Sequence, residues 1–341
     1  MAIASGANYI DLADGRDFVA GISRLDSLAR ERDVLVASGA SSVPALSSAV
    51  VDRYLPSFSR LDTIRVGIGS GARSSGTATL RSVFGYCGKP FQRLQDGRWQ
   101  TVYDWFDTRL HHFPPPVGPR LLGNCDVPDL ALFPERYPGV RNVSFHAGFA
   151  GVSGHLAIWT LALLTRMRLL RSMTSLAERV HTLAEFLEPW FSDRGGIFVE
   201  LEGAGHDGAA LRLSWNLLAA RNHGPYIPCG GAVALARKLA RGERLPRGAL
   251  RGIAQRGGIP RGPGRPGHAR SPAQGHAASP GGLRVWGASI RASNGGGRTV
   301  GRRKARRHGP RIKAQSCSRM AICSIPASSK HSPNSSKPWI R

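Results

Sequence analysis

The chain has 341 residues, which is enough for two domains and a sizeable buried core. Its 47 Lys and Arg residues against 22 Asp and Glu residues give a net charge of +25. Residues 248–341 hold 19 of those basic residues and no acidic residue, so the first 247 residues are only mildly basic and their composition does not indicate a nucleic-acid-binding body.

The first 70 residues alternate short apolar strands with helical patterns, which is typical of βαβ units and a parallel sheet. Strands are predicted at 9–12, 34–37 and about 63–68. A helix is predicted over 17–32, with one buried face made by Phe18, Ile22, Leu25 and Leu28. A turn at 38–42 precedes a second helix near Val43-Pro44, where proline suits the first helical turn.

From Thr77 onward the pattern changes to mixed strands with paired helices. Residues 77–86 predict a helix, and 92–102 predict a hairpin around Asp96-Gly97, a dipeptide that accepts positive φ. After a proline-rich connection, strands are predicted at 140–147, 197–202 and 210–219, and helices at 151–171, 175–190 and 226–241. The apolar run Leu156–Leu164 covers about half of the roughly 20 residues that cross a bilayer, so it is interpreted as a buried helix.

After Arg247 the periodicity stops. This segment is rich in Gly, Pro and Ser and has no Phe or Tyr, so it cannot bury enough apolar surface to offset the backbone entropy of folding, and disorder is predicted. The basic run at 301–308 is typical of a nucleic-acid or localisation patch. The composition is also what GC-rich DNA encodes out of frame, so a frameshifted or wrongly assigned reading frame is favoured over an evolved tail.

Four short motifs in a fixed order resemble the saccharopine-dehydrogenase-like oxidoreductases. They are Gly6-Ala-Asn-Tyr-Ile-Asp-Leu-Ala-Asp-Gly15, Ser38-Gly-Ala-Ser-Ser-Val-Pro44, Gly76-Thr77 and Gly224-Pro-Tyr-Ile-Pro228, and the resemblance spans about residues 1–247. It implies an α/β fold in which a partial Rossmann-like parallel sheet (1–70) carries an inserted α+β substrate domain (71–247). It also implies a further strand and helix after Arg247, where the composition instead predicts a disordered basic tail (248–341). It also implies hydride transfer with NAD or NADP.

The chain departs from this family in one respect. Family members begin with a strand, a G-x-G-x-x-G turn and a helix, a unit that would precede Met1, so the chain is expected to be truncated and to bind NAD(P) weakly. Residues 67–72 fit G-x-G-x-x-A after a strand, yet the next helix is delayed to Thr77. A substrate-side loop or a plain turn is therefore favoured over a dinucleotide loop at 67–72.

Polar residues at strand ends are the candidates for a binding site, because open α/β sheets bind ligands there. Asp11 and Asp14 are predicted to contact the cofactor, although capping of the following helix or of a turn by Asp14 is an equal alternative. Backbone N–H groups at Ser41 and Ser42 are predicted to hold a substrate carboxylate, with helix capping as the competing role.

Further along, Arg221 and His223 form a polar cluster that is predicted to bind substrate and to face Asp11 and Ser42. His146 and His155 carry imidazoles suited to proton transfer, but histidines among apolar residues are more often structural. No residue is assigned a catalytic role, and no spacing indicates a metal site.

The expected partner is a small polar substrate, with a homodimer left open and no membrane attachment. Five cysteines without a C-x-x-C pair indicate reduced thiols and a cytoplasmic protein. The function favoured is an oxidoreductase relative that is incomplete and cofactor-binding deficient as written. The alternative is a non-enzymatic protein that binds nucleic acid through its basic tail. That tail contains only Trp286 and Trp339 for stacking on bases, which weighs against the alternative.

Overall fold

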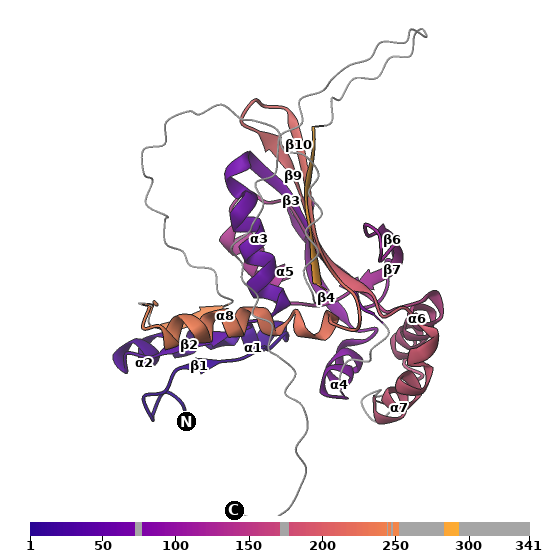
Figure 1. Ribbon diagram of the computed structural model, residues 1–341, viewed down its shortest axis with the longest axis horizontal. Coiled ribbons are helices and arrows are strands. Elements are labelled where there is room, and N and C mark those ends of the chain that lie inside the picture. Colours follow the sequence, from indigo (N-terminus) through magenta and orange to yellow (C-terminus); the bar gives the residue numbers. More distant parts are fainter. Residues whose placement is uncertain (72–76, 171–176, 244, 247, 252–282, 293–341) are drawn as a thin grey trace, which may run out of the picture.

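The computed structural model describes residues 1–71, 77–170, 177–243, 245–246, 248–251 and 283–292. It has a mixed α/β fold, as predicted, with a small parallel sheet, a larger mixed sheet and a separate hairpin (Figure 1). Across the described ranges, no helix has the length and apolar character needed to span a membrane.

The small sheet is parallel and has the order β1–β2–β11. Its strands are β1 (Tyr9–Ile10), β2 (Leu35–Ser38) and β11 (Gly248–Arg251). One face is covered by α1 (Arg16–Gly21), η1 (Ile22–Leu25) and α2 (Asp26–Glu31), and the other by α8 (Cys229–Ala240). Val36 packs on the first face and Leu35 on the second, so β2 is buried on both sides, which explains its continuous apolar run.

The larger sheet has seven strands in the order β12–β10–β9–β3–β8–β7–β6, with β3 and β8 parallel and the other pairs antiparallel. Its strands are β3 (Phe58–Gly69), β6 (Arg109–His112), β7 (Pro119–Asn124), β8 (Asn142–Gly148), β9 (Gly195–Gly205), β10 (Ala210–Ala219) and β12 (Leu283–Ala292).

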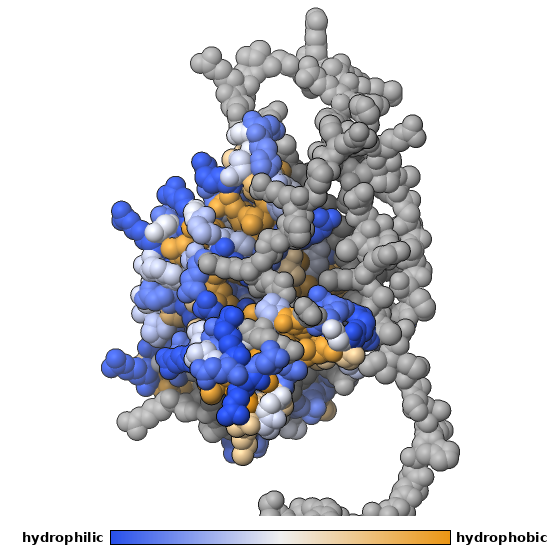
Figure 2. Space-filling model, turned by 90° about the vertical axis from the view of Figure 1, so that its left-hand side faces the viewer, coloured by the Kyte–Doolittle hydropathy of each residue, from blue (hydrophilic) through white to orange (hydrophobic). Residues whose placement is uncertain are grey.

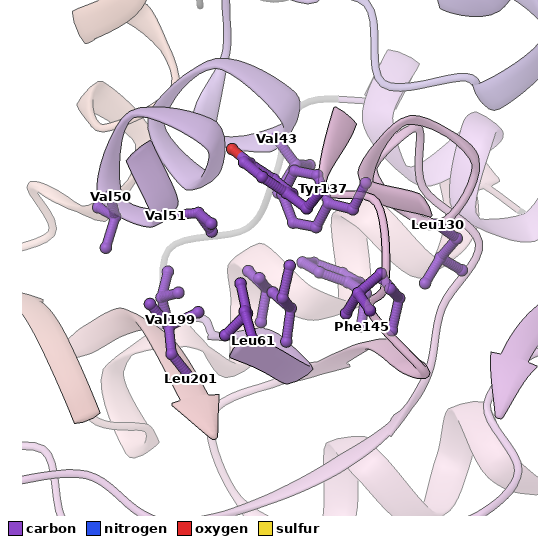
Figure 3. Packing of buried hydrophobic residues seen from close by; sticks show 14 of the residues in the cluster. Val43, Val50, Val51, Leu61, Leu130, Tyr137, Phe145, Val199 and Leu201 are labelled. Carbon is purple, nitrogen blue, oxygen red and sulfur yellow. The ribbon is translucent and has the colours of Figure 1, made fainter. Parts of the chain in front are cut away.

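The main hydrophobic core lies between this sheet and two helices, α3 (Ser47–Tyr54) and α5 (Asp129–Arg136). In Figure 3, Val51 of α3 and the Tyr137 ring lie over the strand residues Leu61, Phe145 and Val199. The chain enters this layer after β2 and returns through α8 to β11, so six of the seven strands are inserted between two strands of the parallel sheet, and only the edge strand β12 follows β11. This arrangement agrees with the predicted combination of a partial Rossmann-like sheet and an inserted α+β domain.

A second core lies at one end of the larger sheet (Figure 1, right). It joins α4 (Thr77–Tyr86) and α6 (Val152–Arg166) through Leu80, Phe84, Trp105, Ile158 and Ala162. Beside these two helices lie α7 (Ala177–Leu187) and η5 (Glu188–Trp190). The separate hairpin consists of β4 (Pro90–Gln95) and β5 (Arg98–Tyr103), and it turns at Asp96-Gly97 as predicted.

Three expectations from the sequence need correction. The strand predicted at 63–68 belongs to the larger sheet, because β3 pairs with β8 and β9 and not with β1 or β2. The predicted helix 17–32 is interrupted by η1, and its buried residues are Val19, Ile22 and Ala29. Phe18, Leu25 and Leu28, which were predicted to be buried with Ile22, are exposed. The helix at 156–164 is buried on only one side, since Leu156 is exposed.

The segment after Arg247 contains two strands that the sequence did not predict. Gly248–Arg251 forms β11, held to β2 by the parallel ladder and by the Gly248 N–H, which donates to the Val34 carbonyl at 3.0 Å. Leu283–Ala292 forms β12, which pairs with β10. The strand β11 was not predicted because four residues are too short to show a period. The strand β12 was not predicted because it is stabilised by pairing with residues some 70 positions earlier in the chain. The rest of 248–341, on which the disorder prediction depends, lies outside the described residues.

Candidate functional site

Asp11 lies at the carboxyl end of β1, where it ties this strand to the turn after β2. Its Oδ1 accepts hydrogen bonds from the Ala13 N–H (2.9 Å), the Ser38 hydroxyl (3.0 Å) and the Gly39 N–H (2.8 Å). Gly39 has φ +73°, and a Cβ there would lie 2.7 Å from Cδ of Pro44, so only glycine fits this turn. The three hydrogen bonds to this one oxygen of Asp11 therefore link the end of β1 to the end of β2.

Ser41 and Ser42 follow this turn and are both buried. Ser41 makes no side-chain capping bond, and Val43 interrupts the helical path with φ −129° and ψ 128°. The segment 42–46, η2 (Ser42–Leu46), is instead covered by α8, and the regular helix α3 begins only at Ser47. Substrate binding by these two serines stays a prediction.

Asp14 lies in the loop between β1 and α1, next to the end of α4. The residue that precedes α1 is Gly15, with no side-chain capping bond, so Asp14 does not cap that helix. The hydroxyl of Tyr86 would lie 3.4 Å from a Cβ on Gly15, which places the end of α4 against this loop. The pKa of Asp14 is raised by partial desolvation, and that of Tyr86 by burial and then by Asp14 and Asp126.

An ion pair joins the start of α1 to the loop that follows β7 in the inserted domain. Arg16 pairs with Asp126, and its Nη1 donates to the Gln92 carbonyl at 3.0 Å. The guanidinium also lies 5.7 Å from the centre of the Phe91 ring. We call the group that surrounds this contact the Asp104 cluster: Asp14, Arg16, Tyr86, Asp104, Cys125 and Asp126.

Asp104 is the most perturbed acid of this cluster. Its side chain is buried, at 1% exposure of the residue, Oδ1 accepts the Asp126 N–H at 3.1 Å, and Oδ2 has no hydrogen-bond partner. Burial raises the pKa of Asp104 to about 8, and the nearby Asp126 carboxylate adds to the shift. At neutral pH this carboxyl is therefore mostly protonated and carries an O–H that can be donated.

The two thiols near Asp104 are inert at neutral pH. Burial raises the pKa of Cys87 to about 12 and the pKa of Cys125 well above its ordinary value. Thiolates are the nucleophilic form, so neither cysteine is suited to covalent catalysis. Within the described ranges, no three or more His, Cys, Asp or Glu side chains are placed to hold a metal ion. What remains at the cluster is proton donation and hydrogen bonding by a neutral carboxyl, a phenol and a guanidinium.

Arg221 and His223 lie elsewhere, after β10. Arg221 and Asn222 have positive φ values of 55° and 56°, and their N–H groups donate to Asp193 at 2.9 and 3.1 Å. A shallow cavity of about 370 Å³ lies beside them, lined by Glu185, Glu188, Pro189, Phe191, Asp193 and Asn222. Among the described residues, no hydrogen bond, ion pair or ring contact joins Arg221 or His223 to Asp11, Asp14, Ser41 or Ser42. A shared substrate site for the two groups remains a prediction.

The side chains of His146, in β8, and of His155, in α6, are both buried. Burial lowers the pKa of His146 to about 3 and also lowers the pKa of His155, so both imidazoles are neutral at pH 7. Nε2 of His155 lies 3.0 Å from the Thr108 hydroxyl, and its ring lies edge-on to Trp105. These contacts suit a packing role.

The glycines of the 67–72 motif serve close packing in β3. A Cβ on Gly67 would lie 2.4 Å from the Phe198 ring, and one on Gly69 would lie 2.8 Å from the Phe113 ring. The strand continues through both positions, so no turn forms around a phosphate there. Ala72 and the basic run at 301–308 lie outside the described residues.

Sequence reasoning missed five members of the Asp104 cluster: Arg16, Tyr86, Asp104, Cys125 and Asp126. They come from four different loops or helix ends, and none belongs to a spaced motif. Their role becomes visible only through burial and pairing, which no local pattern reports.

Comparison with known proteins gives little further information. No protein-family profile matches the chain, and no curated protein matches it. Among solved structures, it is similar to the apo histidine-tagged saccharopine dehydrogenase (L-Glu forming) of Saccharomyces cerevisiae, with a TM-score of 0.47 and 11% identity. The match covers 73% of this chain and 74% of that one. A likeness of this size does not assign the chain to that family.

Proposed function

We propose that this chain is an oxidoreductase relative of the saccharopine-dehydrogenase-like kind, with its small-molecule site at the Asp104 cluster. The supporting observation is a buried carboxyl, protonated at neutral pH, beside the loop that leaves the carboxyl end of β1. Ligands of open α/β sheets bind at such strand ends, and ligand sites favour the junction between domains. The sequence motifs supply the expectation of redox chemistry.

The residues at the strand ends do not fit the pyrophosphate of a nicotinamide cofactor. The loop after β1 carries the carboxylates of Asp11 and Asp14, which would repel phosphates, and α1 has only six residues. After β2, the Gly39 N–H already donates to Asp11, and Val43 breaks the helix start. We therefore propose that NAD or NADP binding is deficient in this chain, and we derive no hydride step.

The chemistry that the chain's own residues support is recognition of a small polar molecule. The free Oδ2 of Asp104 carries or accepts one proton, and the Tyr86 hydroxyl offers a second donor nearby. Arg16 pairs with Asp126 beside them, and burial raises the pKa of Asp126 above its ordinary value more than this ion pair lowers it. A carbonyl or imine oxygen or nitrogen would accept hydrogen bonds from this pair, as substrates of oxidoreductases commonly do.

Calorimetric titration with NADH and NADPH tests the first half of the proposal. The expected Kd is weaker than about 1 mM, an interaction of roughly −4 kcal/mol or less. A micromolar Kd would contradict cofactor deficiency.

The redox half is tested with the oxidised cofactors NAD and NADP at about 10 mM, 10-fold above that Kd, by following the NADH or NADPH that forms at 340 nm with a panel of small 2-hydroxy acids and amines. Slow turnover that Asp104→Asn lowers at least about 10-fold supports the site, with the exposed Asp17→Asn as a matched control. Turnover unaffected by Asp104→Asn places the chemistry elsewhere, and no turnover with any substrate contradicts the oxidoreductase proposal.

A further inference from the structure

The acid at the centre of the proposed site is closed off from solvent. Asp104 is 1% exposed as a residue, and its Oδ2 has no hydrogen-bond partner among the described residues. A small molecule therefore reaches this oxygen only after a covering segment has moved. The segments around Asp104 differ in what holds them in place, and the one that is held by the fewest buried apolar contacts opens at the lowest free energy.

Residues 12–16, which we call the 12–16 lid, lie against two neighbours of the buried acid. The last residue of the lid, Arg16, pairs with Asp126, whose N–H donates to Oδ1 of the acid at 3.1 Å. Gly15 lies against the hydroxyl of Tyr86, and the same acid contributes to the raised pKa of that tyrosine. The lid thus extends from one polar neighbour of the acid to the other.

The other neighbours of Asp104 are held by buried apolar packing. Cys87 and Trp105 are 0% and 2% exposed and belong to the second core, and Val127 belongs to the main core. Moving any of these residues away would expose that apolar surface to water. In the part of the chain that the structure describes, no residue of the 12–16 lid belongs to a hydrophobic cluster. The lid is therefore the segment that opens most easily.

Three contacts of Arg16 hold the lid against the inserted domain. It pairs with Asp126, its Nη1 donates to the Gln92 carbonyl at 3.0 Å, and its guanidinium lies 5.7 Å from the centre of the Phe91 ring. The side chains of the ion pair are 15% and 18% exposed, so both charges are largely removed from water. As the lid opens, both charges regain their hydration, which offsets much of the attraction that is lost.

The chain is anchored on both sides of the lid. Before it, Asp11 is bonded to the Ser38 hydroxyl and to the Gly39 N–H, and after it Val19 is fully buried beneath α1. The outer surface of this region faces solvent, since Leu12 is 41% exposed. Figure 2 views the molecule from the side on which α2 lies in Figure 1, and hydrophilic residues there surround smaller hydrophobic areas. A short segment between two anchors, with solvent outside it, has room to move.

We propose that the 12–16 lid closes the Asp104 cluster through Arg16, and that a small polar molecule enters when Arg16 releases Asp126. This inference rests on the proposed site at that cluster. In the open state, Oδ2 of Asp104 and the Tyr86 hydroxyl face the space that Arg16 has left. Closure over a bound molecule then excludes water from these two groups.

Hydrogen exchange at single amides measures the opening without any ligand. The Asp126 N–H reports the lid, and the Val199 N–H, in the central strand β9, reports the main core. Arg16→Met should raise the exchange rate of the Asp126 N–H at least about 10-fold and leave the rate of Val199 unchanged. Arg60→Met removes an exposed ion pair on β3 as a matched control, and it should change neither rate.

Chemical labelling measures the access of a small molecule to the site. A water-soluble carbodiimide with glycinamide, at about pH 6, converts accessible protonated carboxyls to amides, which are located by peptide mass spectrometry. Asp104 should be labelled slowly in the wild type and at least about 10-fold faster in Arg16→Met. Asp129 is an internal control, because it is also 1% exposed but lies at the start of α5 beside Ser47, and its labelling should stay slow.

The outcomes decide the proposal in either direction. Unchanged exchange at Asp126 and unchanged labelling of Asp104 in a folded Arg16→Met chain overturn it. An equal rise at Val199 or Asp129 means that the whole fold has loosened, and this result also overturns it. If thermal melts show that Arg16→Met does not fold, Arg16→Lys keeps the charge without the planar guanidinium and should raise both rates about 3-fold, and no rise overturns the lid. Neither experiment requires turnover, so failure of the redox proposal leaves both results interpretable.

Discussion

Replacing Asp104 with Asn should abolish one component of the pH dependence of stability. The pKa of Asp104 is about 8 in the folded chain, against an ordinary value of 3.8. Between these values the folded state binds a proton that the unfolded state has released, so the free energy of unfolding falls as the pH rises. Asn cannot ionise, and its amide reproduces the neutral carboxyl in shape and in accepting the Asp126 N–H.

The size of this component follows from the linkage slope of about 1.4 kcal/mol per pH unit for one proton. Between pH 5 and pH 7 the wild-type chain should lose about 2.5 kcal/mol relative to Asp104→Asn. At pH 5 the wild-type chain should already be about 1.7 kcal/mol less stable than Asp104→Asn, because Asp104 is ionised in the unfolded state, and the two stabilities should converge only below about pH 3.8. Above pH 8 the difference should level off.

Urea unfolding, followed by tryptophan fluorescence at half-unit steps from pH 5 to pH 8.5, measures this difference. Trp105 is the neighbouring residue in the chain and is buried, so its emission reports unfolding at this site. Other titrating groups are common to both chains and cancel in the comparison. Asp17→Asn, on the exposed side of α1, should track the wild type at every pH. Parallel curves for wild type and Asp104→Asn would refute the assignment of a protonated buried acid.

Three further changes have expected outcomes of stated size. Gly67→Ala should cost about 1–3 kcal/mol in urea unfolding, because its Cβ would meet the Phe198 ring at 2.4 Å, and a neutral result would contradict the packing role of this glycine. Asp11→Ala should cost about 3 kcal/mol by removing three hydrogen bonds to one carboxylate oxygen, and a loss under 1 kcal/mol would show that the strand ends hold without it. A chain ending at residue 247 should melt at least about 4 °C below one ending at Arg251, because it lacks β11; equal melting temperatures would mean that this strand adds nothing to the parallel sheet.

Local signals in the sequence predicted the elements whose cause is local. Asp96 and Gly97 have φ values of 50° and 77°, which is the turn geometry that this dipeptide favours, and the hairpin around them was predicted. The helix at Thr77–Tyr86 matched its predicted bounds. The partner of a strand is not local information, so the placement of β3 in the larger sheet and the pairing of β12 with β10 could not be read from periodicity.

The candidate site was only partly predictable for the same reason. Asp11 and Asp14 were named because a strand end is marked in the sequence; only Asp14 belongs to the Asp104 cluster, and the cofactor contact predicted for both stays a prediction. The perturbed acid is Asp104, a single aspartate before Trp105 with no motif around it. Its pKa is set by burial beneath segments that come from three other parts of the chain, and burial of that kind is a property of the assembled fold.

The same distinction explains what α6 contributes. Its apolar residues were sufficient to predict a helix and insufficient to say what covers it, because periodicity counts apolar faces without naming their partners. The second core accounts for Ile158 and Ala162, and nothing in the described residues accounts for the outward Leu156. Exposed leucines taken singly need no explanation, so the exposed side of α6 does not by itself identify a partner.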